Sequence, residues 1–293
     1  MKPIQVGLLG IGTVGSGTFE VLKRNQEEIQ RRAGRPIQIT MVADLDTARA
    51  QEIVGNAVKV VNDARLVIAN PEIDIVVELI GGYGIAKQLV LEAIAAGKHV
   101  VTANKALLAV HGTEIFAAAH KKAVMVAFEA AVAGGIPIIK ALREGLSANR
   151  IHWVAGIING TTNFILSEMR DKGLAFGDVL KQAQALGYAE ADPTFDIEGV
   201  DAAHKATIMA AIAFGVPVQF DKAYVEGITK LEAQDIRYAE QLGYRIKLLG
   251  ISKRTATGIE LRVHPCLVPA KQGCTRNSIP VAVRLEIPKS LMR

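Results

Sequence analysis

Two lysines in the 293-residue chain have surroundings suited to proton transfer. Lys205 lies four residues after Asp201, in a stretch otherwise rich in alanine, isoleucine and methionine. Side chains four residues apart share a face of a helix, so this pair is expected to be in contact. Such an apolar helix is a poor solvated surface, and a lysine partly withdrawn from water can serve as proton donor and acceptor. The alternative is an exposed ion pair, which stabilises a protein by roughly a few tenths of a kcal/mol.

The second lysine, Lys105, follows a β-branched run, in the order Thr102-Ala103-Asn104-Lys105. If that run is a strand of a parallel sheet, Thr102 and Lys105 lie at its carboxyl edge, where open α/β folds bind ligands. The alternative is a surface lysine at the start of a helix.

Acidic residues gather in a loop punctuated by glycine and proline, upstream of Lys205. They are Glu190, Asp192 and Asp196. Several carboxylates beside one lysine suit a substrate that carries an amino group.

A glycine-rich turn follows the first apolar run, Ile4–Leu9. It reads Gly10-Ile11-Gly12-Thr13-Val14-Gly15 and precedes an amphipathic stretch. In this strand-turn-helix context, Gly10 allows the tight turn, Gly12 lets the backbone approach a pyrophosphate, and Gly15 lets the helix pack on the strand. We interpret the turn, with Thr13 and Val14 at the helix start, as a dinucleotide site; simple strand-to-helix packing is the alternative.

The second apolar run, Ile37–Ala43, ends at Asp44. A carboxylate there accepts hydrogen bonds from an adenosine ribose and repels a 2′-phosphate, so it favours NAD over NADP. Alternatively, Asp44 or Asp46 only caps a helix that starts near Thr47.

The elements that must position these groups alternate between strand and helix in the first half. Strands are expected at 4–9, 37–43, 73–79, 99–102 and 124–128, with helices such as 14–24 and 85–96 between them. This rhythm predicts an α/β fold with a Rossmann-type, doubly wound parallel sheet.

The pattern changes in the second half, where a strand-like run at 151–158 precedes helical segments at 163–171 and 176–186. An apolar stretch at 206–220 predicts a core helix that ends before Pro217. We therefore expect a dinucleotide-binding domain at 1–135, an α+β substrate-binding, catalytic and dimerisation domain at 136–272, and a tail at 273–293.

Composition excludes several classes of protein. Half of the residues are hydrophobic, and the tail carries +3 of the net charge of +5, so no basic stripe predicts nucleic-acid binding. The two cysteines, Cys266 and Cys274, are too few for a disulfide framework, and the histidine spacing does not suit catalytic zinc. Without an export signal or a long apolar span, the chain is expected in the cytoplasm and away from membranes.

Six segments together resemble the homoserine dehydrogenase family and extend over about nine-tenths of the chain. They are VELIGG at 77–82, AGKHVVTANKA at 96–106, FEAAVAGGIP at 128–137, NGTTN at 159–163, LGYAEADPT at 186–194 and DAAHK at 201–205. The resemblance implies interconversion of L-homoserine and L-aspartate 4-semialdehyde with NAD or NADP, in a homodimer or tetramer.

The resemblance also implies roles for individual residues. Lys205 becomes the proton donor and acceptor, and Lys105, between cofactor and substrate, polarises the reacting oxygen. Asp201, Glu190 and Asp196 match acidic positions that orient the lysine and hold the substrate amino group, and Thr161 matches a substrate-loop position. A sodium ion is implied on four backbone carbonyls, those of Glu129, Val132, Gly134 and Ile136.

The sequence departs from the family pattern at two places. Ala43 stands where many members carry a basic residue, which strengthens the preference for NAD, and the tail matches none of the family's C-terminal elements. The alternation of Ile279, Val281, Val283, Leu285 and Ile287 predicts either one strand or sequence without a selected fold. The alternatives to a homoserine dehydrogenase are a non-catalytic or impaired nucleotide-binding form and another two-domain reductase of the same superfamily.

Overall fold

The computed structural model describes residues 2–270 and 281–285. It divides the chain into two compact units, Met1–Gly134 and Gly135–Arg293, which are described separately below. In the described part of the chain, no helix combines the length and the apolar character needed to cross a membrane.

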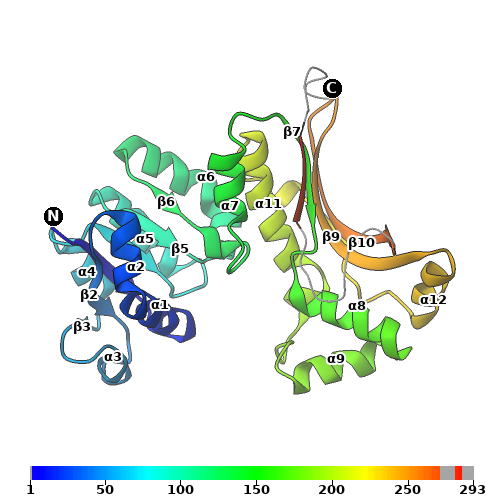
Figure 1. The fold of residues 1–293 in the computed structure, drawn as a ribbon, viewed down its shortest axis with the longest axis horizontal. Helices are drawn as coiled ribbons and strands as arrows, with labels where there is room; N and C mark the ends of the chain where they lie inside the picture. Colours follow the sequence, from blue (N-terminus) through cyan, green and yellow to red (C-terminus); the bar gives the residue numbers. More distant parts are fainter. Residues whose placement is uncertain (1, 271–280, 286–293) are drawn as a thin grey trace. The chain divides into compact units, whose positions relative to one another are not determined.

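The first unit contains a six-stranded parallel sheet (Figure 1). Its strands, β1(Ile4–Leu9), β2(Ile37–Ala43), β3(Lys59–Val61), β4(Ile75–Glu78), β5(His99–Thr102) and β6(Val126–Ala127), lie in the order β3-β2-β1-β4-β5-β6. The chain winds outward from β1 to β3, then returns to the other side of β1 and winds to β6. This confirms the doubly wound fold, whose topological switch point lies between β1 and β4.

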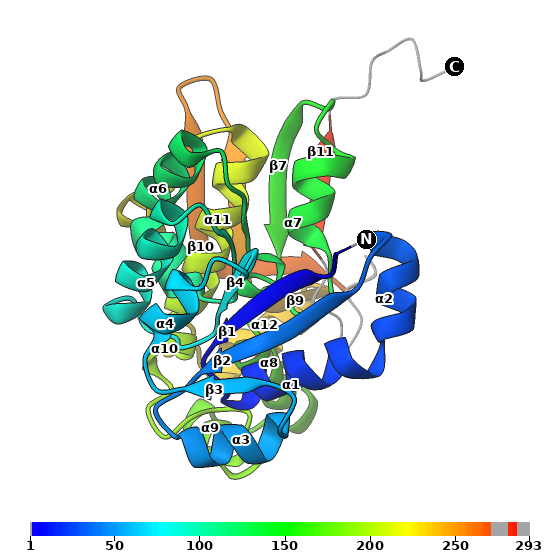
Figure 2. The same cartoon turned by 90° about the vertical axis from the view of Figure 1, so that its left-hand side faces the viewer.

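Helices cover both faces of this sheet. Figure 2 shows α1(Thr13–Arg24) and α2(Gln26–Ala33) on one side, and α4(Ala64–Ala69), α5(Ile85–Ala95) and α6(Lys105–Lys122) on the other. A further helix, α3(Thr47–Val54), connects β2 to β3. Because both faces are covered, the neighbouring residues Leu8 and Leu9 of β1 are both fully buried.

The second unit contains a mixed five-stranded sheet. Its strands, β7(Ile151–Gly156), β8(Tyr224–Val225), β9(Tyr244–Arg254), β10(Ile259–Pro269) and β11(Val281–Leu285), lie in the order β11-β7-β9-β10-β8. Only the β10–β8 pair among these described strands is parallel. The long β9–β10 hairpin was not anticipated from the sequence.

The helices of this unit are α7(Ile138–Lys140), which continues as a π-helix over Ala141–Gly145, and α8(Gly160–Lys172), α9(Phe176–Ala185), α10(Thr194–Ile197), α11(Val200–Phe214) and α12(Ala233–Gln241). The long α11 packs on β7, β9 and β10 and is the helix expected in the core. It ends at Phe214, where Gly215 takes a left-handed conformation with φ +65°, and so confirms a helix that stops before Pro217.

In the tail, the described residues Val281–Leu285 form strand β11, which pairs antiparallel with β7. This agrees with the strand alternative for that segment. Ile279, Ile287 and Cys274 lie outside the described residues.

Candidate functional site

The glycine turn joins β1 to α1 at the switch point of the first unit. Gly10 has φ +91°, and a Cβ there would lie 2.9 Å from the Leu79 carbonyl oxygen. A Cβ on Gly15 would lie 2.2 Å from the Gly10 carbonyl oxygen. Neither position accepts a side chain without movement of the backbone, so both glycines are required by the turn itself.

Gly12 differs from these two glycines because a Cβ there would meet no atom within 4 Å. It is the N-cap of α1, and Thr13 and Val14 are the first two residues of that helix. The first N–H groups of a helix lack partners within the helix and favour an anion such as a pyrophosphate. The open space above Gly12 therefore fits the predicted phosphate position.

Asp44, at the carboxyl end of β2, binds the glycine turn directly. Its Oδ2 accepts a hydrogen bond from the Ile11 N–H at 2.8 Å, and its Oδ1 accepts one from the Asp46 N–H at 3.0 Å. Helix capping falls to Asp46, whose carboxylate accepts the Arg49 N–H at 3.1 Å. A carboxylate has about four acceptor positions, so Asp44 retains capacity for a ribose hydroxyl.

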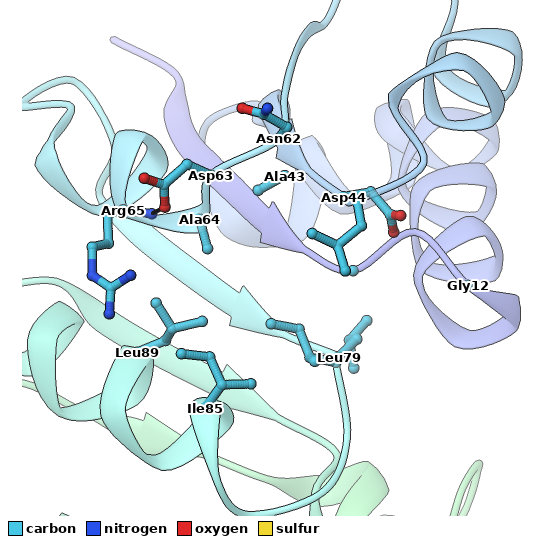
Figure 3. A pocket seen from close by; sticks show the side chains of 13 residues that line it. Gly12, Ala43, Asp44, Asn62, Asp63, Ala64, Arg65, Leu79, Ile85 and Leu89 are labelled. Carbon is cyan, nitrogen blue, oxygen red and sulfur yellow. Dashed lines mark hydrogen bonds between the residues drawn. The ribbon is translucent and has the colours of Figure 1, made fainter.

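A cavity of about 490 Å³ opens beside Asp44 (Figure 3). Gly12 and Asp44 lie on one side of it, and Leu79, Ile85 and Leu89 form an apolar wall; Gly10 also lines the cavity. Asp63 and Arg65 come from the segment after β3, and the Arg65 Nε lies 3.1 Å from Oε2 of Glu92. The size and the mixed lining suit a small organic ligand, and the position is the one expected for a nucleotide.

Thr102 and Lys105 lie at the carboxyl end of β5, as expected. Thr102 is 1% exposed, and its hydroxyl donates to Glu78 Oε2 at 2.7 Å, so a cofactor contact here would use the Thr102 backbone. Lys105 is the first residue of α6, after Asn104, whose Oδ1 caps the helix by accepting the Leu107 N–H. Sequence reasoning missed Glu78 and Asn104, because neither stands in a spacing that signals chemistry.

In the second unit, Lys205 and Asp201 are in contact on α11. The Lys205 Nζ donates to Asp201 Oδ2 at 2.7 Å and to the Ile158 carbonyl oxygen at 2.9 Å. The two side chains are 18% and 5% exposed. The pair is therefore largely buried, and the alternative of an exposed surface ion pair is wrong.

Asn159 joins this pair to a second carboxylate. Its Nδ2 donates to Asp201 Oδ2 at 2.9 Å and to Asp196 Oδ1 at 2.7 Å, while its Oδ1 accepts the Thr162 N–H at 2.8 Å. Thr161, from the same strand-to-helix junction, places its hydroxyl 3.0 Å from Asp196 Oδ2. One junction thus brings together Lys205, Asp201, Asp196 and Thr161, and Asn159 is a residue that sequence reasoning missed.

The other acidic residues of the loop lie apart from these contacts. Glu190 and Asp192 are exposed, and the Asp192 carboxylate accepts the Thr194 N–H at 3.1 Å. Hydrogen bonds from the side chain and the backbone of Thr194 lower the pKa of Asp192. Asp192 is therefore held within its own turn, and the described contacts do not join Glu190 to Asp196.

The carbonyl ligands implied for sodium belong to different units: Glu129, Val132 and Gly134 to the first, Ile136 to the second. The Glu129 carbonyl oxygen accepts the Val132 N–H at 3.3 Å and keeps a second lone pair. The sodium site stays a prediction. In the described ranges, no cluster of three or more histidine, cysteine, aspartate or glutamate side chains is arranged to hold a metal. Cys266 is a free thiol, and burial raises its pKa to about 11.

The parallel sheet, the glycine turn at its switch point and the adjoining cavity define the first unit as a dinucleotide-binding domain of the Rossmann type. Residues 10–129 match the family model described as homoserine dehydrogenase, NAD binding domain, and residues 137–278 match the model described as homoserine dehydrogenase. The chain belongs to the homoserine dehydrogenase family.

Individual relatives agree with this assignment. The homoserine dehydrogenase of Pseudomonas aeruginosa is 66% identical over 272 residues, which are 92% of this chain and 62% of that protein. The crystal structure of a homoserine dehydrogenase from Thiobacillus denitrificans is 64% identical with a TM-score of 0.93, over 98% of this chain and 67% of that one. A homoserine dehydrogenase structure from S. aureus is 36% identical, with a TM-score of 0.79, over 93% and 69% of the two chains. The chain thus spans about 62% of the length of the curated relatives that it matches.

Proposed function

We propose that the chain is an NAD(P)-dependent homoserine dehydrogenase that interconverts L-homoserine and L-aspartate 4-semialdehyde. The observation that carries the proposal is the buried Lys205–Asp201 pair, which Asn159 connects to Asp196. In this proposal, residues 1–135 bind the dinucleotide, and residues 136–272 bind the substrate and contribute the dimer contacts of a homodimer or tetramer.

The dinucleotide would lie along the glycine turn. The N–H groups of Thr13 and Val14 would hold the pyrophosphate above Gly12, and the remaining acceptor capacity of Asp44 would hold the adenosine ribose. Because a 2′-phosphate would be repelled by Asp44, we propose a preference for NAD. A hyperthermophilic archaeal homoserine dehydrogenase of this fold, 23% identical to this chain, was solved in complex with NADPH, so the fold by itself does not exclude NADPH.

Bound nicotinamide supplies the hydride acceptor or donor of the reaction, and the protein supplies the proton chemistry. Two of the three N–H donors of a lysine ammonium are taken by Asp201 and the Ile158 carbonyl. The remaining position would face the substrate oxygen. In oxidation, Lys205 would act as the neutral amine, with its two N–H groups on Asp201 and Ile158, and its lone pair would take the hydroxyl proton; in reduction, the ammonium so formed would return that proton. Lys105 would polarise the same oxygen from the cofactor side.

The substrate amino group would be held by acidic and polar groups. The single Thr161 hydroxyl proton is shared between the Tyr188 carbonyl oxygen at 2.8 Å and Asp196 Oδ2 at 3.0 Å, and a bound ammonium would add charge-assisted donors to the Asp196 carboxylate. We propose that Glu190 completes the ammonium site. A sodium ion on the carbonyls of Glu129, Val132, Gly134 and Ile136 is proposed from the family resemblance of that loop.

The test is oxidation of L-homoserine followed at the absorbance band of the reduced nicotinamide, for the unmodified protein and Lys205→Met. General acid–base help accelerates reactions by about 10²- to 10⁴-fold, so we expect kcat to fall by at least about 100-fold while cofactor affinity is nearly unchanged. Lys222→Met, at an exposed lysine of the same unit, is the control and should keep full turnover.

Two results would contradict the proposal. If Lys205→Met retained more than about a tenth of the unmodified kcat, Lys205 would not transfer the proton. If the unmodified protein bound NAD or NADP but did not oxidise homoserine, the proposal would be wrong, and turnover of another aldehyde or imine would then separate a different reductase from a form without activity.

A further inference from the structure

Glu78 is a carboxylate at the carboxyl end of β4 that sequence reasoning did not single out. It is completely buried, with an exposed fraction of 0%. Its Oε1 accepts hydrogen bonds from the N–H groups of Ile80 at 2.9 Å and Gly81 at 3.2 Å. A buried polar group is costly unless hydrogen bonds replace its water, so the burial of Glu78 depends on the donors that surround it.

The two N–H groups that donate to Glu78 belong to the loop at 79–82, which forms part of the cavity wall. Leu79 and Ile80 line the cavity, and the Leu79 N–H donates to the Leu9 carbonyl, next to the glycine turn. Gly81 and Gly82 both have positive φ, +84° and +66°. Two successive left-handed residues leave N–H groups without a regular partner, and the Glu78 carboxylate supplies one.

The other oxygen of Glu78 extends the network to the next strand. Oε2 accepts the Thr102 hydroxyl at 2.7 Å, and the Thr102 oxygen in turn accepts the Asn104 N–H at 2.9 Å. Asn104 then caps α6 with its Oδ1 and donates from Nδ2 to the Gly82 carbonyl. The network is closed, because it leaves the loop at 79–82 through Glu78 and returns to it through Asn104.

Lys105 follows directly on this network, as the first residue of α6. We propose that Glu78 is a positioning residue that holds the cavity wall at 79–82 and the turn bearing Lys105 as one rigid element. The proposal rests on the proposed function in assigning Lys105 to the reaction. The mechanical link between the two loops stands on the hydrogen bonds alone.

Glu78→Gln tests the link with almost no change of volume. A glutamine oxygen can still accept from Ile80 and Gly81, but its NH₂ group then faces the Thr102 hydroxyl, which needs an acceptor. The Thr102 O–H is then left without its buried acceptor, and only a reversed bond from the glutamine NH₂ to the Thr102 oxygen can remain, so the connection between the loops is weakened. Thr102→Val removes the same hydrogen bond from the other side, while Thr102→Ser retains the hydroxyl.

The first measurement is amide hydrogen exchange of the protein without cofactor or substrate. We expect peptides containing residues 79–82 and 103–107 to exchange about tenfold faster in Thr102→Val, to exchange faster by a smaller factor in Glu78→Gln, and to remain slow in Thr102→Ser. The control is Lys98→Met, at a 7% exposed lysine just before β5, whose Nζ donates to the Asn70 and Ile73 carbonyls. It also removes a buried polar group from this unit, but at the opposite end of β5, so both loops should keep their slow exchange.

The second measurement is kinetic. A displacement of about 1 Å in catalytic groups can cost about 10²-fold in rate, so kcat should fall about 10- to 100-fold in Thr102→Val and less in Glu78→Gln. The double variant should be little worse than Thr102→Val alone, because both substitutions act on one network. Lys98→Met should keep most of its kcat.

Distinct results overturn the proposal and the proposed function. Unchanged exchange in both loops of Thr102→Val, additive losses in the double variant, or an equal loss of kcat in Lys98→Met would each refute the positioning role. Exchange requires no turnover, so faster exchange in both loops supports the link even if homoserine is not a substrate.

Discussion

The glycine turn makes a prediction that separates a structural glycine from a binding one. An alanine Cβ at position 15 would lie 2.2 Å from the Gly10 carbonyl oxygen, whereas ordinary contact begins at 3.4 Å. The turn must therefore open by more than about 1 Å, and overpacking of this kind costs about 1–3 kcal/mol or more. For a chain of this size, each kcal/mol lowers Tm by about 2–4 °C, so Gly15→Ala should unfold roughly 5–10 °C lower.

Gly12→Ala should behave in the opposite way. Its Cβ would meet no protein atom within 4 Å, so the expected cost is only that of alanine as a poorer N-cap, and Tm should fall by no more than about 2–4 °C. The added methyl group would occupy the space where we place the pyrophosphate, and we expect the Kd for NADH to rise at least about tenfold, which corresponds to about 1.4 kcal/mol.

Gly17→Ala is the matched control, because Gly17 is an exposed residue of α1 with the same open surroundings. Alanine is favoured over glycine in a helix by about 0.5–1 kcal/mol, so this variant should be slightly more stable and bind NADH normally. The assays are thermal unfolding and NADH fluorescence titration. A normal Tm for Gly15→Ala would show that the close approach of residue 15 to the Gly10 carbonyl is not required for stability. A normal Kd for Gly12→Ala would show that Gly12 does not face the phosphates.

Three further outcomes are expected. Asp44→Ala should reduce the ratio of kcat/KM with NAD to kcat/KM with NADP, and it should weaken the binding of both cofactors because the hydrogen bond from the Ile11 N–H is also lost. An unmodified protein that prefers NADP would contradict this expectation. Asn159→Ala should lose an N-cap, which costs about 1 kcal/mol, and lower kcat more than tenfold; an unchanged kcat at a lowered Tm would make Asn159 a cap only. Arg284 lies in β11, which is paired with β7, so trypsin should cut slowly after it. In Val283→Pro, the proline disrupts this pairing and cleavage should be faster; equal cleavage rates would refute the pairing.

The first unit was predictable from the sequence because its strands are apolar on both faces. Residues 75–77 form a continuous apolar run, as buried parallel strands require, and the glycine turn follows directly on such a strand. The short β3(Lys59–Val61) was missed, because three residues give too little pattern to distinguish a strand from a loop.

The sheet of the second unit was harder to predict, because its strands carry charged residues. Lys247 of β9 is 2% exposed, and its Nζ donates to Asn163 Oδ1 at 2.6 Å and Ser167 Oγ at 3.0 Å. A lysine in a strand is normally a sign of exposure, and here the partners on α8 help to satisfy the buried ammonium group. Asn159 and Glu78 were missed for a similar reason. Their roles depend on hydrogen bonds to residues that are distant in the sequence, and a sequence pattern does not show such bonds.

The tail shows why an alternating pattern does not by itself specify a strand. In β11, Val281, Val283 and Leu285 are partly buried, while Ala282 and Arg284 are exposed, so the period of two is present. Five residues of this kind do not form a stable strand alone, because each backbone group needs a neighbour. The neighbour is β7, far earlier in the chain, and a register shift between Arg284 and Leu285 marks the end of the match. The strand is thus a joint property of two distant segments, and inspection of either segment separately leaves the choice between strand and unselected sequence open.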